Sequence, residues 1–267
     1  MMMEIISYNH VHFVRENRVI LDDMNWTVKK GEHWAVLGLN GSGKSTMLNM
    51  MGGYEFPTRG TIHVFGHQYG KYNWEYIKKR LGFVGNTLNR FLSTLNQESA
   101  HEIIVSGKFN SIGIYEETTE EDWEKAKHLL KEFRLSYLAG HPYRYLSQGE
   151  QRRVLIARAF MAQPDIMILD EPCSGLDVRA REQLLEALQR KAVKTDTALL
   201  YVTHHIEEII PAITHVAVIS EGKMIAAGLK KEVLTNKVLS NAFALPVEIE
   251  WRDERSWLQV VKKVHDS

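Results

Sequence analysis

Apolar and polar residues alternate in short runs over the first third of the chain. Polar residues separate four β-prone runs before residue 30, at residues 5–8, 11–14, 19–21 and 24–28. This alternation predicts an antiparallel sheet. Residues 34–37 (Trp-Ala-Val-Leu) are apolar without interruption, which indicates a buried strand, and residues 47–51 then suit a helix.

The pattern becomes helical in the middle of the chain. Strands are predicted at residues 61–65 and 81–84, and helical spacing then extends from about residue 86 to residue 145. Within it, residues 99–106 predict one helix. Residues 119–122 (Thr-Glu-Glu-Asp) resemble a capping box that begins a second helix. The apolar side chains of this second helix share one face: Trp123, Ala126, Leu129, Leu130 and Phe133.

Buried strands alternate with helices again after residue 165. Strands are predicted at residues 166–171, 198–203, 216–219 and 223–226, with a helix from about residue 178 to residue 194. Such alternation predicts an α/β fold whose parallel sheet is covered on both faces. The helical stretch is then an insertion into this core, and a helix with a small appendage follows residue 229.

These patterns divide the chain into four parts. Residues 1–85 hold the antiparallel β-subdomain and the first part of the core, and residues 86–160 form the helical subdomain. Residues 161–228 complete the core, and residues 229–267 are the C-terminal appendage.

Composition narrows the classes of partner. The 267 residues are 44% apolar, and Lys plus Arg equals Asp plus Glu at 33 each, so charge offers no case for a nucleic-acid surface. Cys173 is the only cysteine, which excludes an intrachain disulfide and fits a reducing compartment. The N-terminus lacks the pattern of a signal peptide, and no apolar run could span a bilayer. We therefore expect a cytoplasmic protein, and any membrane-spanning part must belong to another chain.

One segment carries the clearest chemistry. Residues 38–46 (GLNGSGKST) match the phosphate-binding pattern G-x-x-x-x-G-K-[ST] between a predicted strand and a predicted helix. Backbone N–H groups of such a loop close around phosphates, helped by the positive end of the helix. An ordinary glycine turn would not fill every fixed position. The residues predicted to bind nucleotide are Gly38, Asn40, Gly41, Ser42, Gly43, Lys44, Ser45 and Thr46.

Four further segments resemble the motifs of ABC-type ATPases. Residues 146–151 (LSQGEQ) resemble the signature sequence, residues 170–172 (DEP) the Walker B segment, and residues 174–177 (SGLD) the D-loop. His204 matches the switch histidine. The resemblance covers about residues 3–228 and implies a RecA-like P-loop NTPase core with an N-terminal antiparallel β-subdomain and an inserted α-helical subdomain. If the chain were a P-loop kinase or GTPase, residues 147–150 and His204 would match the ABC motifs only by chance, so we discard that alternative.

The resemblance assigns roles to individual residues. Asp170 would help Ser45 to hold Mg²⁺, and Glu171 would polarise the attacking water as general base. His204 would sense the γ-phosphate of ATP, whereas His205 is expected to point elsewhere. The signature residues would face the ATP of a second subunit, and D-loop residues would couple the two sites in a head-to-tail homodimer; these residues are Ser147, Gln148, Gly149, Ser174 and Asp177.

The sequence departs from the family pattern at a few positions. Asn86 stands where the family usually has Gln; its shorter amide can still reach Mg²⁺ or water. Gln148 replaces the second glycine of the signature. Phe13 is the preferred candidate for stacking on adenine, with Tyr8 in reserve, and either could instead belong to the core. Cys173 is interpreted as a small packed residue.

Two functions remain open. In the first, the chain is the ATPase subunit of a membrane transporter, peripheral at the inner face of the membrane and bound to a permease. The ending (residues 232–235 and 244–247) resembles metal and siderophore importer ATPases, and residues 31–38 resemble molybdate-linked ones. In the second, it is a soluble ABC ATPase with a regulatory or remodelling role. The sequence names no cargo, and it favours import over export only because no membrane domain is fused.

Overall fold

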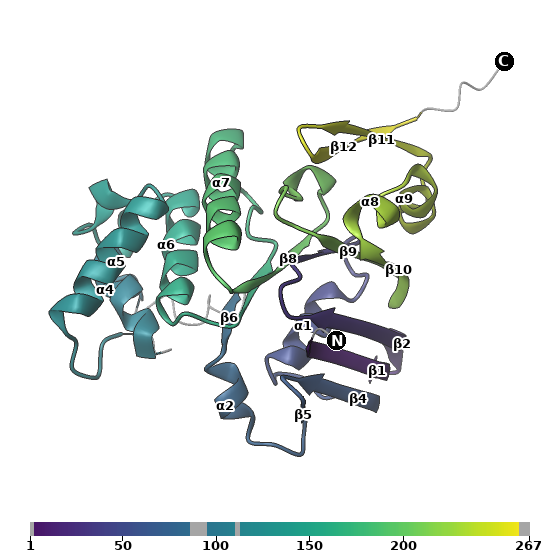
Figure 1. The fold of residues 1–267 in the computed structure, drawn as a ribbon, viewed down its shortest axis with the longest axis horizontal. Helices are drawn as coiled ribbons and strands as arrows, with labels where there is room; N and C mark the ends of the chain where they lie inside the picture. Colours follow the sequence, from purple (N-terminus) through teal and green to yellow (C-terminus); the bar gives the residue numbers. More distant parts are fainter. Residues whose placement is uncertain (1–2, 86–94, 110–112, 262–267) are drawn as a thin grey trace. The chain divides into compact units, whose positions relative to one another are not determined.

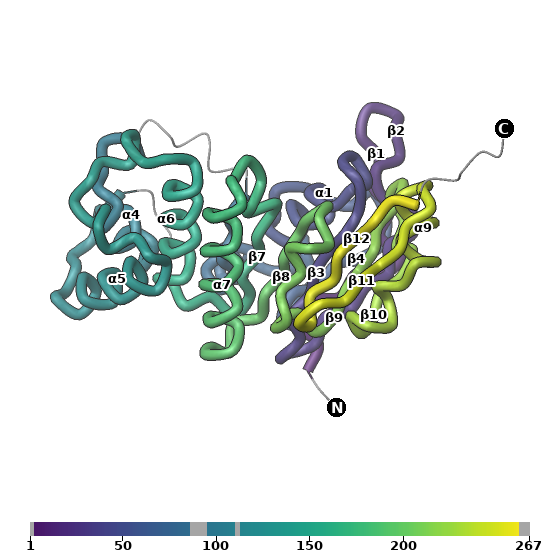
Figure 2. Tube along the Cα trace, turned by 90° about the horizontal axis from the view of Figure 1, so that it is seen from above, coloured from purple at the N-terminus to yellow at the C-terminus, as the bar shows by residue number. Residues whose placement is uncertain are grey.

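The computed structural model describes residues 3–85, 95–109 and 113–261. Its contacts cluster into two compact units (Figures 1 and 2). The first comprises Met1–Ile77 and Ala198–Ser267, and the second comprises Lys78–Thr197. Asn86, the predicted substitute for the usual Gln, lies outside the described residues.

The first unit contains a four-stranded antiparallel sheet in the order β2-β1-β4-β5 (Figure 1). Its strands are β1 (Glu4–Arg15), β2 (Arg18–Lys29), β4 (Arg59–Val64) and β5 (His67–Gln68). The predicted runs before residue 30 are thus two long strands rather than four short ones. Polar residues do not end β1, because the register shifts between Tyr8 and Val11, where His10 has a φ of 50°.

The same unit holds the strands that position the phosphate loop. β3 (Trp34–Leu37) pairs in parallel with β8 (Ala198–Thr203) and β9 (His215–Ser220), and β10 (Lys223–Leu229) is antiparallel to β9. Every residue of β3 and β8 is buried, as the uninterrupted apolar runs predicted. Helix α1 (Lys44–Met51) follows β3 after the glycine loop, and a short helix, α2 (Trp74–Lys78), precedes the second unit.

The second unit combines a parallel strand pair with a group of helices. β6 (Leu81–Val84) pairs with β7 (Ile166–Asp170). The helices are α4 (Ala100–Ser106), α5 (Glu120–Glu132), α6 (Gln148–Met161) and α7 (Val178–Lys194). Helices α4, α5 and α6 pack against one another (Figures 1 and 2). The predicted capping box of α5 is confirmed. Of its predicted apolar face, Ala126, Leu129, Leu130 and Phe133 are buried, and Trp123 is half-buried.

The C-terminal segment of the first unit has more structure than the sequence indicated. Helices α8 (Lys230–Val233) and α9 (Asn236–Phe243) are followed by a hairpin of β11 (Val247–Arg252) and β12 (Arg255–Val260). The hairpin lies alongside α9 (Figure 2). Its two turn residues, Asp253 and Glu254, have φ values of 47° and 62°, the left-handed conformation of tight hairpin turns. The predicted α/β class is confirmed.

Candidate nucleotide-binding site

The phosphate loop connects the end of β3 to the first turn of α1. Gly41 and Gly43 have φ values of 80° and 105°, which favour glycine. Lys44 is 4% exposed, and its Nζ donates to the carbonyl oxygens of Gly38 (2.8 Å) and Leu39 (3.0 Å). The ammonium group is therefore held inside the loop, where phosphate oxygens could reach it.

Neighbouring strands brace this loop closely. A Cβ on Gly43 would lie 2.7 Å from Cδ2 of Leu21, and one on Gly38 would lie 2.3 Å from the carbonyl oxygen of Ile219. In the turn between β9 and β10, the N–H of Gly222 donates to the carbonyl of Ser42 at 3.1 Å. Sequence reasoning gave Gly222 only the role of a turn residue.

The loop suits a phosphate group. Ser42 is buried, and its Oγ has no hydrogen-bond partner in the described part of the chain. A buried hydroxyl that lacks a partner costs free energy, which a phosphate oxygen at this position would recover. Ser45, three residues later, is exposed at the start of α1. The loop thus has buried cationic charge, an unsatisfied donor and an exposed hydroxyl on one short segment.

The predicted Walker B residues lie at the end of β7 in the second unit. β7 ends at Asp170, and a Cβ on Gly85, just beyond β6, would lie 3.2 Å from the Cβ of Asp170. The next residue, Glu171, has a φ of 48°. A non-glycine residue in this region is strained, and such strain concentrates at functional sites. The N–H of Ser174 donates to the carbonyl of Glu171 at 3.1 Å, which closes a tight turn after the strand.

The predicted signature residues begin α6. Ser147 caps the helix: its Oγ accepts from the N–H of Glu150, while the Ser147 N–H and hydroxyl donate to Oε2 of Glu150 at 2.8 and 2.7 Å. Tyr137 donates to the other carboxylate oxygen. Burial alone would raise the pKa of Glu150, but the hydrogen bonds from Tyr137 and Ser147 outweigh it and lower that pKa. The S-x-x-E spacing signals this capping box, which sequence reasoning overlooked.

The signature and D-loop segments lie close together within the second unit. A Cβ on Gly149 would lie 3.0 Å from the Cβ of Ala180, and one on Gly175 would lie 3.3 Å from Oε1 of Gln148. Asp177 caps α7 by accepting from the N–H of Ala180 at 2.7 Å. A cavity of about 680 Å³ opens beside Ser147 and Asp177. The charged side chains of its lining are Arg134, Arg153, Arg179 and Asp177, and Arg134 also pairs with Glu186 at 2.6 Å.

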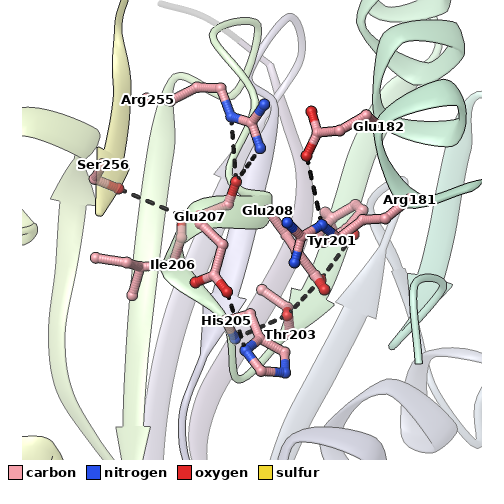
Figure 3. Close-up of polar contacts among 10 residues, drawn as sticks. All are labelled: Arg181, Glu182, Tyr201, Thr203, His205, Ile206, Glu207, Glu208, Arg255 and Ser256. Carbon is pink, nitrogen blue, oxygen red and sulfur yellow. Dashed lines mark hydrogen bonds and ion pairs between the residues drawn. The ribbon is translucent and has the colours of Figure 1, made fainter. Parts of the chain in front are cut away.

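His204 directly follows β8 in the first unit (its neighbours appear in Figure 3). Its ring centroid lies 4.2 Å from that of His205. The two rings are tilted by 41° to each other, and the expectation that only His204 faces the nucleotide stays a prediction. Nδ1 of His205 also lies 3.4 Å from a carboxylate oxygen of Glu207.

The structure separates the two aromatic candidates for adenine stacking. Tyr8 is 1% exposed, and its hydroxyl donates to the carbonyl of Met47 at 2.7 Å. Burial raises its pKa well above the ordinary value. Phe13 is half-buried, with the guanidinium of Arg15 5.5 Å from its ring centroid. Of the two, only Phe13 keeps part of its side chain exposed to solvent.

Oxygen donors suit the predicted Mg²⁺. The Ser45 hydroxyl and the Asp170 carboxylate are hard ligands of the kind that Mg²⁺ prefers. No group of three or more His, Cys, Asp or Glu side chains that could hold a metal occurs in residues 3–85, 95–109 and 113–261. Because Mg²⁺ in nucleotide sites takes most ligands from phosphates and water, such a group is not required.

Strand, glycine loop and helix, with a buried lysine at the start of the helix, define a P-loop nucleotide-binding protein. Comparison with known proteins places it more closely. Residues 21–174 match the family model described as ABC transporter. The uncharacterized ABC transporter ATP-binding protein YlmA of Bacillus subtilis is 41% identical over 95% of this chain and 96% of its own length. The chain belongs to the ABC transporter family and is an ATP-binding protein of that family.

Other relatives support the same assignment. The zinc uptake system ATP-binding protein ZurA of Listeria innocua is 31% identical over 82% of this chain and 84% of its own length, so the predicted resemblance to importer ATPases is confirmed. The dimeric structure of MJ0796, a bacterial ABC transporter cassette, superposes with a TM-score of 0.71 at 26% identity, covering 84% of this chain and 98% of that chain. The RecA-like P-loop fold is likewise confirmed.

Proposed function

We propose that this chain hydrolyses ATP and drives transport as a head-to-tail homodimer beneath a membrane permease. The observation that carries the proposal is Glu171: a carboxylate held at a strained φ of 48° directly after the strand that ends in Asp170. Glu16 has nearly the same φ in an ordinary turn, so the support comes from the place of Glu171 at the end of β7 together with its backbone strain of about 1–3 kcal/mol.

Hydrolysis would proceed by in-line attack of water on the γ-phosphate. Lys44 and the backbone of the phosphate loop would hold the β- and γ-phosphates, and Glu171 would accept the proton of the attacking water. His204 would donate a hydrogen bond to the γ-phosphate. Ser45 and Asp170 would hold Mg²⁺, which supplies charge neutralisation at the phosphate oxygens when it is bound.

The cation-rich cavity supports the dimer. It opens beside Ser147 at the N-terminal end of α6, where the Glu150 carboxylate already accepts from the Ser147 N–H and hydroxyl, so the arginines supply its positive charge. An anion from a second subunit, the γ-phosphate of its ATP, suits such a surface. Ser147, Gln148 and Gly149 would then contact the partner's ATP, while Ser174 and Asp177 would couple the two sites. The dimeric state of the cassette MJ0796 agrees with this arrangement.

The proposal includes a membrane permease as the partner of this chain. In residues 3–85, 95–109 and 113–261 no helix is long and apolar enough to cross a membrane. In the proposed transporter another subunit spans the membrane, and this chain is peripheral at its inner face. ZurA, named for a zinc uptake system, favours transport. The alternative is an ABC ATPase that acts on a soluble partner.

The variant Glu171→Gln tests base and dimer together. We expect slow Mg²⁺-dependent hydrolysis by the native chain, and ATP binding without turnover by the variant, which should elute as a dimer on sizing. Glu16→Gln is the matched control, because Glu16 has a similar φ of 49° in the turn between β1 and β2. A Glu171→Gln variant that hydrolyses normally and stays monomeric with ATP would refute both assignments.

The ATP-trapped variant also separates the two functions. Recovery of a polytopic membrane protein with it, and a gene for such a protein beside its own, would support transport. Recovery of a soluble complex alone would favour the regulatory alternative.

A further inference from the structure

The C-terminal hairpin binds the loop that follows the switch histidine. Figure 3 shows Arg255 and Ser256, the first residues of β12, directed at the backbone of the short 3-10 helix Ile206–Glu208. That helix begins two residues after His204. Both elements belong to the first unit, and the mechanism proposed above assigns no role to the hairpin.

Arg255 and Ser256 satisfy the carbonyls of this helix. Nε of Arg255 donates to the carbonyl of Glu207 at 3.2 Å, and Nη2 donates to the same oxygen. The hydroxyl of Ser256, which is 1% exposed, donates to the carbonyl of Ile206 at 3.4 Å. The carbonyl of Ile206 also accepts from the N–H of Ile209 at 3.1 Å, which closes the 3-10 turn. Arg255 and Ser256 therefore tie a turn that is already formed to β12.

A buried carboxylate fixes the opposite side of the same loop. Glu208 is 4% exposed and accepts from the hydroxyls of Tyr201 (3.0 Å) and Thr203 (2.7 Å) in β8. Oγ1 of Thr203 in turn accepts from the N–H of His205 at 3.0 Å. His204 therefore lies in a segment held by β8 through Glu208 and by β12 through Arg255.

The hairpin is itself held by α9. The N–H of Val247 donates to Oγ of Ser240 at 3.0 Å, and the N–H of Ile249 donates to Oδ1 of Asn236 at 2.9 Å. Helix α9 is joined to the sheet by the hydroxyl of Ser220, which donates to the carbonyl of Ala242 at 3.1 Å. Hydrogen bonds thus connect β9, α9, the hairpin and the loop after His204, which contains the helix Ile206–Glu208.

We infer that Arg255 is a positioning residue for ATP hydrolysis, which holds the loop after His204 in the register that the γ-phosphate requires. The inference rests on the proposed function for its catalytic consequence, but the contact itself does not. The guanidinium suits this task because two of its N–H groups meet one carbonyl oxygen, which fixes direction as well as distance.

Steady-state hydrolysis by Arg255→Ala tests the inference. Hydrogen bonds to charged groups are strong, and each factor of ten in rate is about 1.4 kcal/mol, so we expect kcat about three- to tenfold lower. The KM for ATP, and ATP affinity in the Glu171→Gln background, should stay within twofold. The kcat of Arg255→Lys, whose side chain places one donor toward the carbonyl, should lie between that of the native chain and that of Arg255→Ala. Arg252→Ala is the matched control, since Arg252 lies across the same turn and pairs with Glu250.

Hydrogen exchange separates local release from general destabilisation. In Arg255→Ala, amides of residues 203–210 should exchange faster while β3 and α1 exchange as in the native chain. Unchanged exchange in residues 203–210, or faster exchange throughout the first unit, would overturn the inference, as would a kcat equal to that of Arg252→Ala. A native chain that binds ATP without hydrolysing it would refute the proposed function. The exchange comparison would still test whether Arg255 holds the loop after His204.

Discussion

Two constraints meet at Gly43 in the phosphate loop. Its φ of 105° is one that side chains rarely adopt, and a Cβ there would lie 2.7 Å from Leu21 and 3.0 Å from the carbonyl of Ile20. The second contact is with backbone, which cannot turn away as a side chain can. The loop therefore approaches β2 so closely that only glycine fits.

We expect Gly43→Ala to lower ATP affinity by at least about tenfold, because strain of about 1–3 kcal/mol would open the loop or shift it from the phosphates. Titration with a fluorescent ATP analogue measures this. Gly31→Ala is the control: its φ of 86° gives backbone strain, but nothing lies within 4 Å of the added Cβ. Equal affinities for the two variants would contradict the steric account.

The sequence predicted the identity of the loop residues but not what braces them. The fixed positions of the phosphate loop are adjacent in the chain, so their spacing is visible in the sequence. The contact of Gly222 with Ser42 joins residues 180 positions apart, and a turn glycine gives no signal of it. The choice between Phe13 and Tyr8 required burial, which two aromatic residues in one β-prone segment do not reveal.

Among the elements, α5 begins with a charged capping box. Oδ2 of Asp122 accepts from the N–H (2.9 Å) and hydroxyl (2.9 Å) of Thr119 and from Nζ of Lys108 (2.6 Å). The hydrogen bond from Lys108, with those from Thr119, lowers the pKa of Asp122 from 3.8 to about 2. The ionised carboxylate thus favours the folded state.

This arrangement predicts a stability that depends on pH. A lowered pKa in the folded state means that the contribution of Asp122 is complete above about pH 4 and is lost as the pH falls toward about 2. Asp122→Asn should cost about 1 kcal/mol at pH 6 in urea unfolding, and the difference from the native chain should shrink below pH 4. Glu121→Gln, at an exposed position of the same first turn, should change stability little at pH 6 and below pH 4. A difference that is constant from pH 6 to pH 3 would contradict this account.

Elements with local signals were predicted and those without were not. The T-x-x-D sequence at α5 and the apolar runs of β3 and β8 carry their own patterns. The hairpin of β11 and β12 was missed because its turn is Asp253-Glu254 rather than a glycine-containing pair. The continuity of β1 was missed because a register shift at His10 leaves no mark in the sequence except a polar interruption.

For the molecule as a whole, ATP should act as a folding ligand. A ligand that binds only the folded state stabilises it by RT ln(1 + [L]/Kd), or about 2.7 kcal/mol at a hundredfold excess over Kd. We expect the Tm of the native chain to rise by several degrees with Mg-ATP. Lys44→Ala should lose this shift, whereas Lys30→Ala, in the exposed turn before β3, should keep it. An undiminished shift in Lys44→Ala would place the nucleotide elsewhere.

The backbone conformation of Glu171 lowers the stability of the fold at a position where the proposed mechanism needs a carboxylate. A left-handed conformation is relaxed in glycine and tolerable in asparagine, and a glutamate there makes the whole chain less stable than it could be. If Glu171 is the base, a selection for thermal stability alone would replace it early, and the resulting variants would be more stable but would not hydrolyse ATP. Stabilised lineages of this chain should therefore be screened for turnover at every round.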